Sequence, residues 1–225
     1  MTGRGLQRRS AGAKKDRARR HFDRWSGRYE KDRASRWLAG VQAEALAALD
    51  LQGDDRLLDV GCGTGAAVRD AAPRVERAVG VDLSPAMIAR ARQLAADLPN
   101  AEFQEADSER LPFDDAAFTA ILCTTSFHHY PDPRRATREM ARVLAPSGRV
   151  VIGDGCGDRF ATRVLDTALR LFQPSHVHLH TSRELASLLT EAGLSPESPR
   201  LLWRGGYVIM TARRHPVRSP ATALS

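Results

Sequence analysis

The stretch LLDVGCGTG, residues 57–65, is an apolar run that ends in a glycine-rich turn. A buried strand followed by residues without Cβ atoms lets a ligand approach the backbone closely. Gly61, Gly63 and Gly65 form one regular series. With Ala66 as its last member, the same turn also fits the dinucleotide fingerprint G-x-G-x-x-G/A. The turn therefore predicts a nucleotide-bearing cofactor without deciding which one.

Strands and helices alternate on both sides of this turn. Apolar runs predict strands over residues 56–60, 75–82, 101–105, 118–125 and 149–154. Helical spacing and helix-start signals predict helices over residues 34–49, 66–72, 84–94 and 132–144. This alternation implies right-handed βαβ crossovers, and hence an α/β fold with a doubly wound, mostly parallel sheet and helices on both faces. Such sheets bind ligands at the carboxyl ends of their strands.

The remaining part of the chain has a different pattern. We expect a helix over residues 161–172, and a capping box, Thr181-x-x-Glu184, opens a further helix that stops at Gly193. Apolar segments at 201–203 and 207–211 flank a Gly-Gly pair and predict a C-terminal antiparallel hairpin. Together with the five parallel strands, the hairpin gives a seven-stranded sheet.

Charge is concentrated at the N-terminus. The net charge is +7, and the first 24 residues hold nine Lys or Arg against two Asp, so they account for the whole excess. We expect residues 1–20 to be a disordered basic tail, 21–213 a single domain and 214–225 a flexible tail, with residues 21–50 and 155–182 forming lids. No apolar run is long enough to span a bilayer, and the three cysteines follow no disulfide or zinc pattern, so we expect a cytoplasmic protein, monomeric or homodimeric.

Two acidic residues help to choose between cofactors. Asp59 lies directly before the glycine turn, where it would repel a pyrophosphate and attract an amino group. Asp82 ends the second predicted strand, where a carboxylate accepts ribose hydroxyls of either cofactor. Asp59 therefore favours S-adenosylmethionine, which carries an ammonium and a sulfonium but no phosphate.

With these features the chain resembles the class I S-adenosylmethionine-dependent methyltransferases, in particular the small-molecule family that includes the ubiquinone/menaquinone-type enzymes. The resemblance covers residues 21–154, through HFDRWSGRYE, LLDVGCGTG, AVGVDLSPAMIARAR, FQEADSERLPFDDAAFTAILCTTSFHHYPDP and EMARVLAPSGRVVIGD. It implies a Rossmann-like fold, S-adenosyl-L-methionine as cofactor, S-adenosyl-L-homocysteine as product, and methyl transfer to a small molecule through oxygen, carbon or nitrogen.

The resemblance also implies roles for individual residues. The methionine part of the cofactor would contact the glycine turn, the ribose would contact Asp82, and the adenine would lie between apolar side chains and an acidic edge. The implied cofactor-binding residues are Tyr29, Asp59, Gly61, Cys62, Gly63, Asp82, Leu83, Met87, Asp107, Ser108 and Cys123. For Met87 core packing is an equally good interpretation, and Asp107 also suits a plain turn.

Histidines mark the expected acceptor side. His128 and His129 follow the fourth predicted strand, and either could act as a general base, with His128 the better candidate. His176, His178 and His180 alternate in SHVHLH, which would place three imidazoles on one face of an extended segment. Because that run contains no carboxylate, we expect it to line the acceptor pocket and predict no metal site.

Three other functions remain open at this point. The basic tail could anchor an RNA methyltransferase, although the amino-methylating Asn-Pro-Pro-aromatic signature is absent after the fourth strand. The chain could instead bind S-adenosylmethionine without catalysis. An NAD-dependent dehydrogenase is the most distant alternative.

Overall fold

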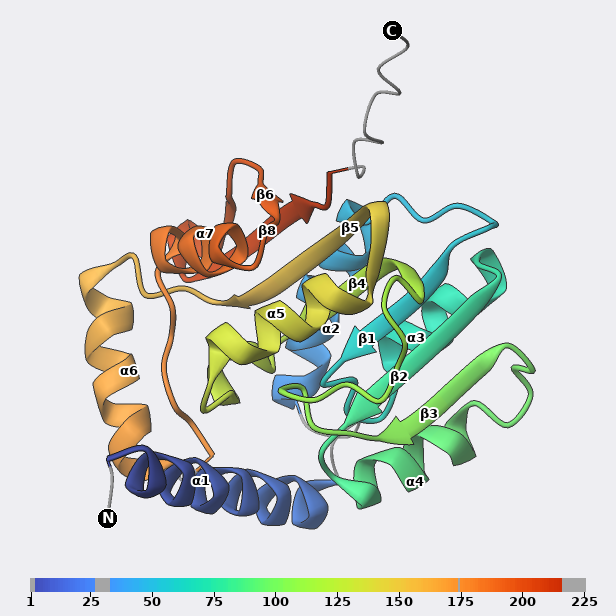
Figure 1. Ribbon diagram of the computed structural model, residues 1–225. Coiled ribbons are helices and arrows are strands. Elements are labelled where there is room, and N and C mark those ends of the chain that lie inside the picture. Colours follow the sequence, from blue (N-terminus) through green and yellow to red (C-terminus); the bar gives the residue numbers. More distant parts are fainter. Residues whose placement is uncertain (1–2, 27–32, 174, 216–225) are drawn as a thin grey trace, which may run out of the picture.

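The computed structural model describes residues 3–26, 33–173 and 175–215. Its centre is a sheet in the order β3-β2-β1-β4-β5-β8-β6, with β7 paired to β8 (Figure 1). The parallel strands are β1 (Arg56–Val60), β2 (Arg77–Asp82), β3 (Ala101–Glu105), β4 (Phe118–Thr124) and β5 (Leu144–Gly155). The antiparallel strands are β8 (Tyr207–Arg213), which pairs with β5, and β6 (Ser195–Pro196) and β7 (Arg200–Leu202), which both pair with β8.

The predicted doubly wound sheet with a C-terminal hairpin is confirmed. The structure adds the two-residue strand β6, so the sheet has eight strands rather than seven. Trp203 does not belong to β7; it begins the single 3-10 turn η4 (Trp203–Gly205) that joins β7 to β8.

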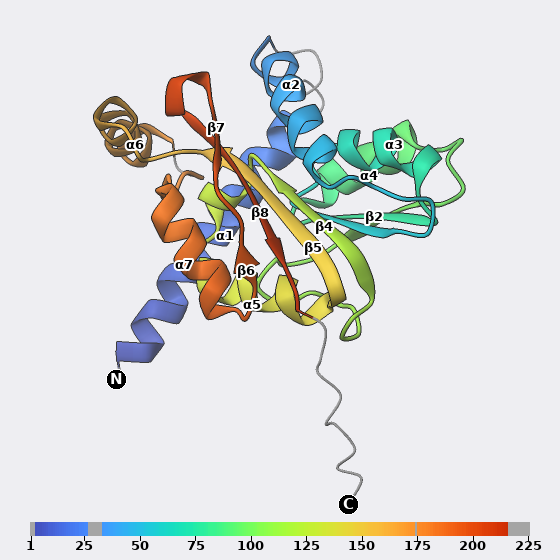
Figure 2. The same ribbon diagram turned by 90° about the horizontal axis from the view of Figure 1, so that it is seen from above.

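Helices cover both faces of the sheet, as Figure 2 shows. One face carries α2 (Arg33–Ala48), α3 (Ala66–Ala71) and α4 (Pro85–Leu94), and the other carries α5 (Pro133–Val143) and α7 (Ser182–Glu191). The apolar stripe of α2 packs on β4 and β5, while the Leu-rich face of α7 and the buried face of α5 close the opposite side. Burial of these stripes is the main force that holds the helices to the sheet.

Helix starts follow the capping signals in the sequence. The Ser84 hydroxyl accepts a hydrogen bond from the Met87 N–H at the start of α4. Thr181 and Glu184 form the predicted reciprocal capping box of α7. Such caps satisfy N–H groups that have no partner inside the helix, so the side chains fix where each helix begins.

The N-terminal segment differs from the expectation. Residues 3–25 form the helix α1 (Gly3–Trp25), where we expected a disordered tail as far as residue 20. The segment is rich in Arg and also holds Ala and Lys, which favour helix, and Ala18 becomes buried against the domain. In Figure 1, α1 runs along the bottom of the domain toward α4, and α6 (Phe160–Phe172) stands at the left of the domain.

No helix within the described ranges is both long and apolar enough to cross a membrane. The longest of them, α1, is strongly polar.

Candidate functional site

A cavity of about 100 Å³ lies at the carboxyl ends of the parallel strands, beneath α1. It lies where the loops after β1, β2, β3 and β4 meet, as expected for a doubly wound sheet. Seven of the eleven predicted cofactor-binding residues line it: Gly61, Gly63, Asp82, Leu83, Met87, Asp107 and Ser108. The fold therefore brings together predicted residues that are up to 47 positions apart in the sequence.

The glycine turn forms one wall of the cavity. Gly61 has φ +81°, and a Cβ at this position would overlap the side chain of Ser126 and lie 3.0 Å from the Tyr130 hydroxyl. The N–H of Gly63 donates to Asp82 Oδ2 at 3.0 Å, and the N–H of Ser84 donates to Asp82 Oδ1 at 2.8 Å. These bonds fix the Asp82 carboxylate at the cavity, although its burial raises its pKa above the usual range.

Asp59 is a buried carboxylate without a hydrogen-bond partner. It is 1% exposed, and neither of its carboxylate oxygens is paired. Burial, together with the nearby charge of Asp82, raises the pKa of Asp59 to about 7. A buried acid of this kind is costly unless a donor or a cation reaches it. The ammonium of S-adenosylmethionine is such a group, so these residues fit that cofactor.

The opposite end of the cavity fits an adenine. Leu83 and Met87 offer apolar contacts, and Met87 is only 1% exposed. Asp107 follows β3, and its Oδ1 accepts a hydrogen bond from the Glu109 N–H at 3.0 Å. Its Oδ2 forms an ion pair with Lys15 of α1 at 2.6 Å. The acid that the resemblance assigns to the adenine amino edge is thus held by a lysine of α1.

Helix α1 covers the cavity through four side chains that we did not predict: Lys15, Ala18, Arg19 and Phe22. Lys15 also pairs with Glu109 at 2.5 Å, and the Ser84 hydroxyl donates to Asp23 at 2.5 Å. For Lys15, Ala18 and Arg19 the sequence offers only the apolar pair at positions 18 and 22, which is too weak to reveal a contact within so basic a segment. Phe22 lies within the HFDRWSGRYE motif and within the expected lid.

Other predicted residues lie elsewhere. Cys62 and Cys123 are buried behind the cavity wall and are not among its lining residues. The Cys123 sulfur lies 3.2 Å from Ser126 Oγ and 3.5 Å from Tyr130 Oη, so it supports residues that do line the cavity. Tyr29 lies outside the described residues, and its predicted contact stays a prediction.

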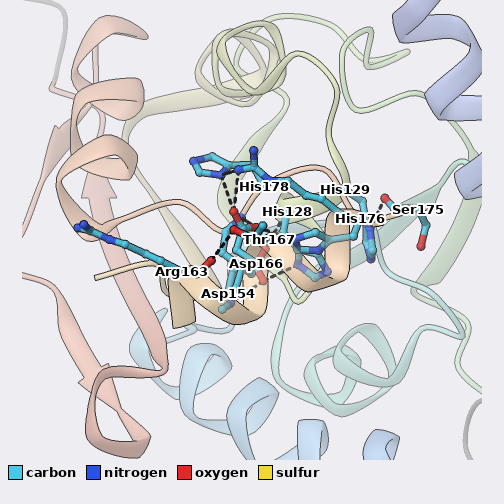
Figure 3. Close-up of polar contacts among 12 residues, drawn as sticks. His128, His129, Asp154, Arg163, Asp166, Thr167, Ser175, His176 and His178 are labelled. Carbon is cyan, nitrogen blue, oxygen red and sulfur yellow. Dashed lines mark hydrogen bonds and ion pairs between the residues drawn. The ribbon is translucent and has the colours of Figure 1, made fainter. Parts of the chain in front are cut away.

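His128 and His129 are adjacent but have different partners (Figure 3). His128 Nδ1 lies 2.7 Å from Asp154 Oδ1, and the His128 N–H donates to Asp154 Oδ2 at 2.8 Å. His129 lines the cavity, and its Nδ1 donates to the Ser175 carbonyl at 2.7 Å. Burial, together with His128, lowers the pKa of His129 well below its usual range, so its ring is neutral.

The three histidines of SHVHLH do not line the cavity. His176 lies 2.7 Å from Asp166 of α6, with its ring 5.3 Å from that of His128. His178 and His180 form a second group, with ring centroids 4.6 Å apart. The segment therefore divides between the side of His128 and the beginning of α7.

The fold and the place of the cavity agree with the resemblance to class I methyltransferases. Residues 58–152 match the family model described as a methyltransferase domain, and this segment contains the glycine turn and the carboxyl ends of β1, β2, β3 and β4.

The chain is 36% identical over 156 residues to the 27-O-demethylrifamycin SV methyltransferase of Amycolatopsis mediterranei, covering 67% of this chain and 57% of that protein. It is 41% identical over 120 residues to the demethylmenaquinone methyltransferase of Deinococcus radiodurans, covering 52% and 48% respectively. The chain thus spans about half the length of these relatives. The solved structure of Bacillus subtilis YcgJ has the same fold, with a TM-score of 0.70 at 22% identity over 79% of this chain and 99% of that one.

Proposed function

We propose that the protein transfers a methyl group from S-adenosylmethionine to a small-molecule acceptor. The observation that carries the proposal is Asp59, a buried and unpartnered carboxylate beside the glycine turn. A dinucleotide would bring phosphates to this turn and leave Asp59 both uncompensated and repelled. The small-molecule acceptor is supported by the relatives named for rifamycin and menaquinone methylation.

Each part of the cofactor has a matching group at the cavity; Asp59 is buried behind the glycine turn and is not among the lining residues, and the other groups line the cavity. Asp59 would bind the ammonium, Asp82 the ribose hydroxyls, and Asp107 the amino edge of the adenine. Leu83 and Met87 would contact one face of the adenine. When bound, the cofactor supplies an electrophilic methyl group on a sulfonium. The protein's contribution to such a displacement is to position the acceptor in line with the methyl group.

The acceptor would approach from the histidine side. His129 lines the cavity, and residues 155–182, which include α6, would form a lid over the acceptor. Because Asp154 accepts from His128 Nδ1–H, the other ring nitrogen, Nε2, is left as a proton acceptor. For an acceptor that must lose a proton, we propose the His128–Asp154 pair as the general base.

Compartment and assembly follow as narrower proposals. All three cysteines are free and buried, which suits a reducing compartment, so we propose the cytoplasm. A monomer or a homodimer is consistent with a cavity built within one chain.

The test combines binding with transfer. We expect calorimetry to show S-adenosylhomocysteine binding at one site and NAD not binding, and Asp59→Asn to weaken the binding of S-adenosylhomocysteine at least about 30-fold. Methyl-labelled S-adenosylmethionine should label a member of a panel of demethylated quinols and hydroxylated polyketides. Label transfer to RNA alone would support the nucleic-acid alternative, and cofactor binding without transfer to any candidate would support a non-catalytic role.

A further inference from the structure

Two histidines and a glutamate meet outside the cofactor cavity, where the chain enters α7. We propose that His178, His180 and Glu184 form a binding site for a divalent transition metal, most suitably Zn²⁺. One potential ligand atom from each residue lies within 4.8 Å of the other two. None of the three lines the cofactor cavity, so this site is separate from the one already described.

The distance between His178 and Glu184 suits a single ion. His178 Nε2 lies 3.4 Å from Glu184 Oε2. Two ligand atoms about 2.1 Å from a zinc ion, at a tetrahedral angle, lie about 3.4 Å apart. The ring of His180 is adjacent to that of His178, with centroids 4.6 Å apart, and can complete a three-residue face.

The glutamate is already held in place by the capping box. Its Oε2 accepts from the Thr181 N–H at 2.8 Å and from the Thr181 hydroxyl at 3.1 Å. These bonds fix the carboxylate on the first turn of α7, facing the preceding histidine segment. Because part of the ordering cost is already met by folding, an ion would gain a partly preformed site.

His178 has the outer carboxylate partner that metal-binding histidines usually have. Its Nδ1 lies 3.3 Å from Asp166 Oδ2 (Figure 3). Its Nε2 is the ring nitrogen that faces Glu184. Asp166 is fixed by the Leu179 N–H at 2.8 Å and by an ion pair with Arg170 at 2.7 Å. A guanidinium N–H of Arg170, which can only donate, also faces His178 Nδ1, so binding of an ion to Nε2 requires Nδ1 to take the proton and Arg170 to keep only its pair with Asp166. This carboxylate–histidine arrangement orients the ring and makes Nε2 a better ligand.

The donor set selects the class of metal. Two imidazole nitrogens and one carboxylate oxygen suit zinc and its transition-metal neighbours, whereas magnesium and calcium prefer oxygen alone. The three residues leave a fourth tetrahedral position open to water.

An ion at this site would tie the segment 175–181 to the start of α7. The same segment carries the Ser175 carbonyl that holds His129, and His176 beside the His128 ring. The ion would therefore order one wall of the acceptor side without touching the reacting atoms.

The test uses the full-length, tag-free protein after treatment with a chelator. Calorimetric titration with Zn²⁺ should show one ion per chain. His178→Ala, His180→Ala and Glu184→Gln should each weaken binding at least tenfold. His215→Ala is the matched control, because this exposed histidine pairs with Ser195 near the C-terminal strands and should leave Zn²⁺ affinity unchanged. Binding of S-adenosylhomocysteine to each variant checks that the domain is folded.

Cobalt gives an independent readout. A four-coordinate Co²⁺ complex should produce visible absorption bands in the wild type that the His178→Ala and His180→Ala variants lack. The proposal is overturned if the wild type takes up no stoichiometric Zn²⁺. It is equally overturned if the double variant His178→Ala, His180→Ala binds as tightly as the wild type.

Discussion

At the scale of single residues, the charged carboxylate of Asp59 favours cofactor binding but destabilises the cofactor-free folded protein. Its carboxylate is buried and has no partner, and its pKa is raised to about 7 by burial and by Asp82. An acid whose pKa is raised on folding favours the folded state only while it is protonated. Its stabilising contribution is therefore complete below about pH 4 and is lost as the pH rises through 7 in the cofactor-free protein.

The Asp59→Asn substitution should therefore stabilise the cofactor-free protein more at pH 8 than at pH 4. The difference in unfolding free energy between variant and wild type should grow by about 2–4 kcal/mol over that interval, because the variant has no charge to bury. Urea unfolding at both pH values measures this change. The same variant should bind S-adenosylhomocysteine at least about 30-fold more weakly, since a buried charge pair is lost. Equal pH dependence in the two proteins would contradict the assignment.

The His128–Asp154 pair gives a second prediction at this scale. For an acceptor that loses a proton, His128→Ala should lower kcat by about 10²–10⁴-fold and leave the Kd of S-adenosylhomocysteine unchanged. Asp154→Asn should give a smaller loss, because it removes the group that orients the ring. If His129→Ala gives the larger kcat loss, His129 is the base instead.

At the scale of elements, the sequence best predicts the ends of helices and strands that neighbouring residues determine. Ser84 begins α4 and Thr181 with Glu184 begins α7 as their side chains require, and β1 and β3 have the expected ends. The two-residue β6 exists only because β8 offers it a partner, so no pattern in residues 195–196 could reveal it.

The position of helix α1, in a segment whose first 20 residues we expected to be disordered, also depends on distant parts of the chain. Its helical conformation agrees with its composition, but its place depends on Lys15 meeting two acids about 92 and 94 positions further along the chain. Local patterns cannot show such meetings, because they depend on the tertiary arrangement.

The ion pairs of Lys15 lead to a prediction of how α1 affects the dissociation of the cofactor. Lys15 binds Asp107 and Glu109, and Glu109 is 6% exposed, so removing the ammonium leaves a nearly buried acid without its cationic partner and with only the Asp132 N–H as donor. Lys15→Ala should loosen α1 and raise the dissociation rate of S-adenosylhomocysteine about three- to tenfold, measured by stopped-flow displacement. Lys14→Ala is the matched control, since it removes the same charge from the neighbouring position. An unchanged rate in Lys15→Ala would show that α1 does not retain the cofactor.

At the scale of the whole molecule, the site is assembled from segments that are distant in the sequence. The glycine turn, the ends of β2 and β3, the loop after β4 and helix α1 all contribute to one cavity. The sheet supplies the acids and glycines, and its parallel order brings them to one edge. Helix α1 supplies the cover, so cofactor affinity should depend on a part of the chain that the sheet does not need.

Removal of residues 1–20 tests this dependence and also the role of the basic charge. The truncated protein should keep the sheet and its two helical layers. Among the removed residues whose side chains the structure describes, Ala18 is the only apolar one that is buried, so the core loses little. It should bind S-adenosylhomocysteine at least about tenfold more weakly, since it loses Lys15, Ala18 and Arg19 from the cavity wall. Circular dichroism and calorimetry measure the two effects. In an RNA methyltransferase the truncation would mainly abolish RNA binding and its dependence on salt, whereas here transfer to a small acceptor should persist once the cofactor is saturating.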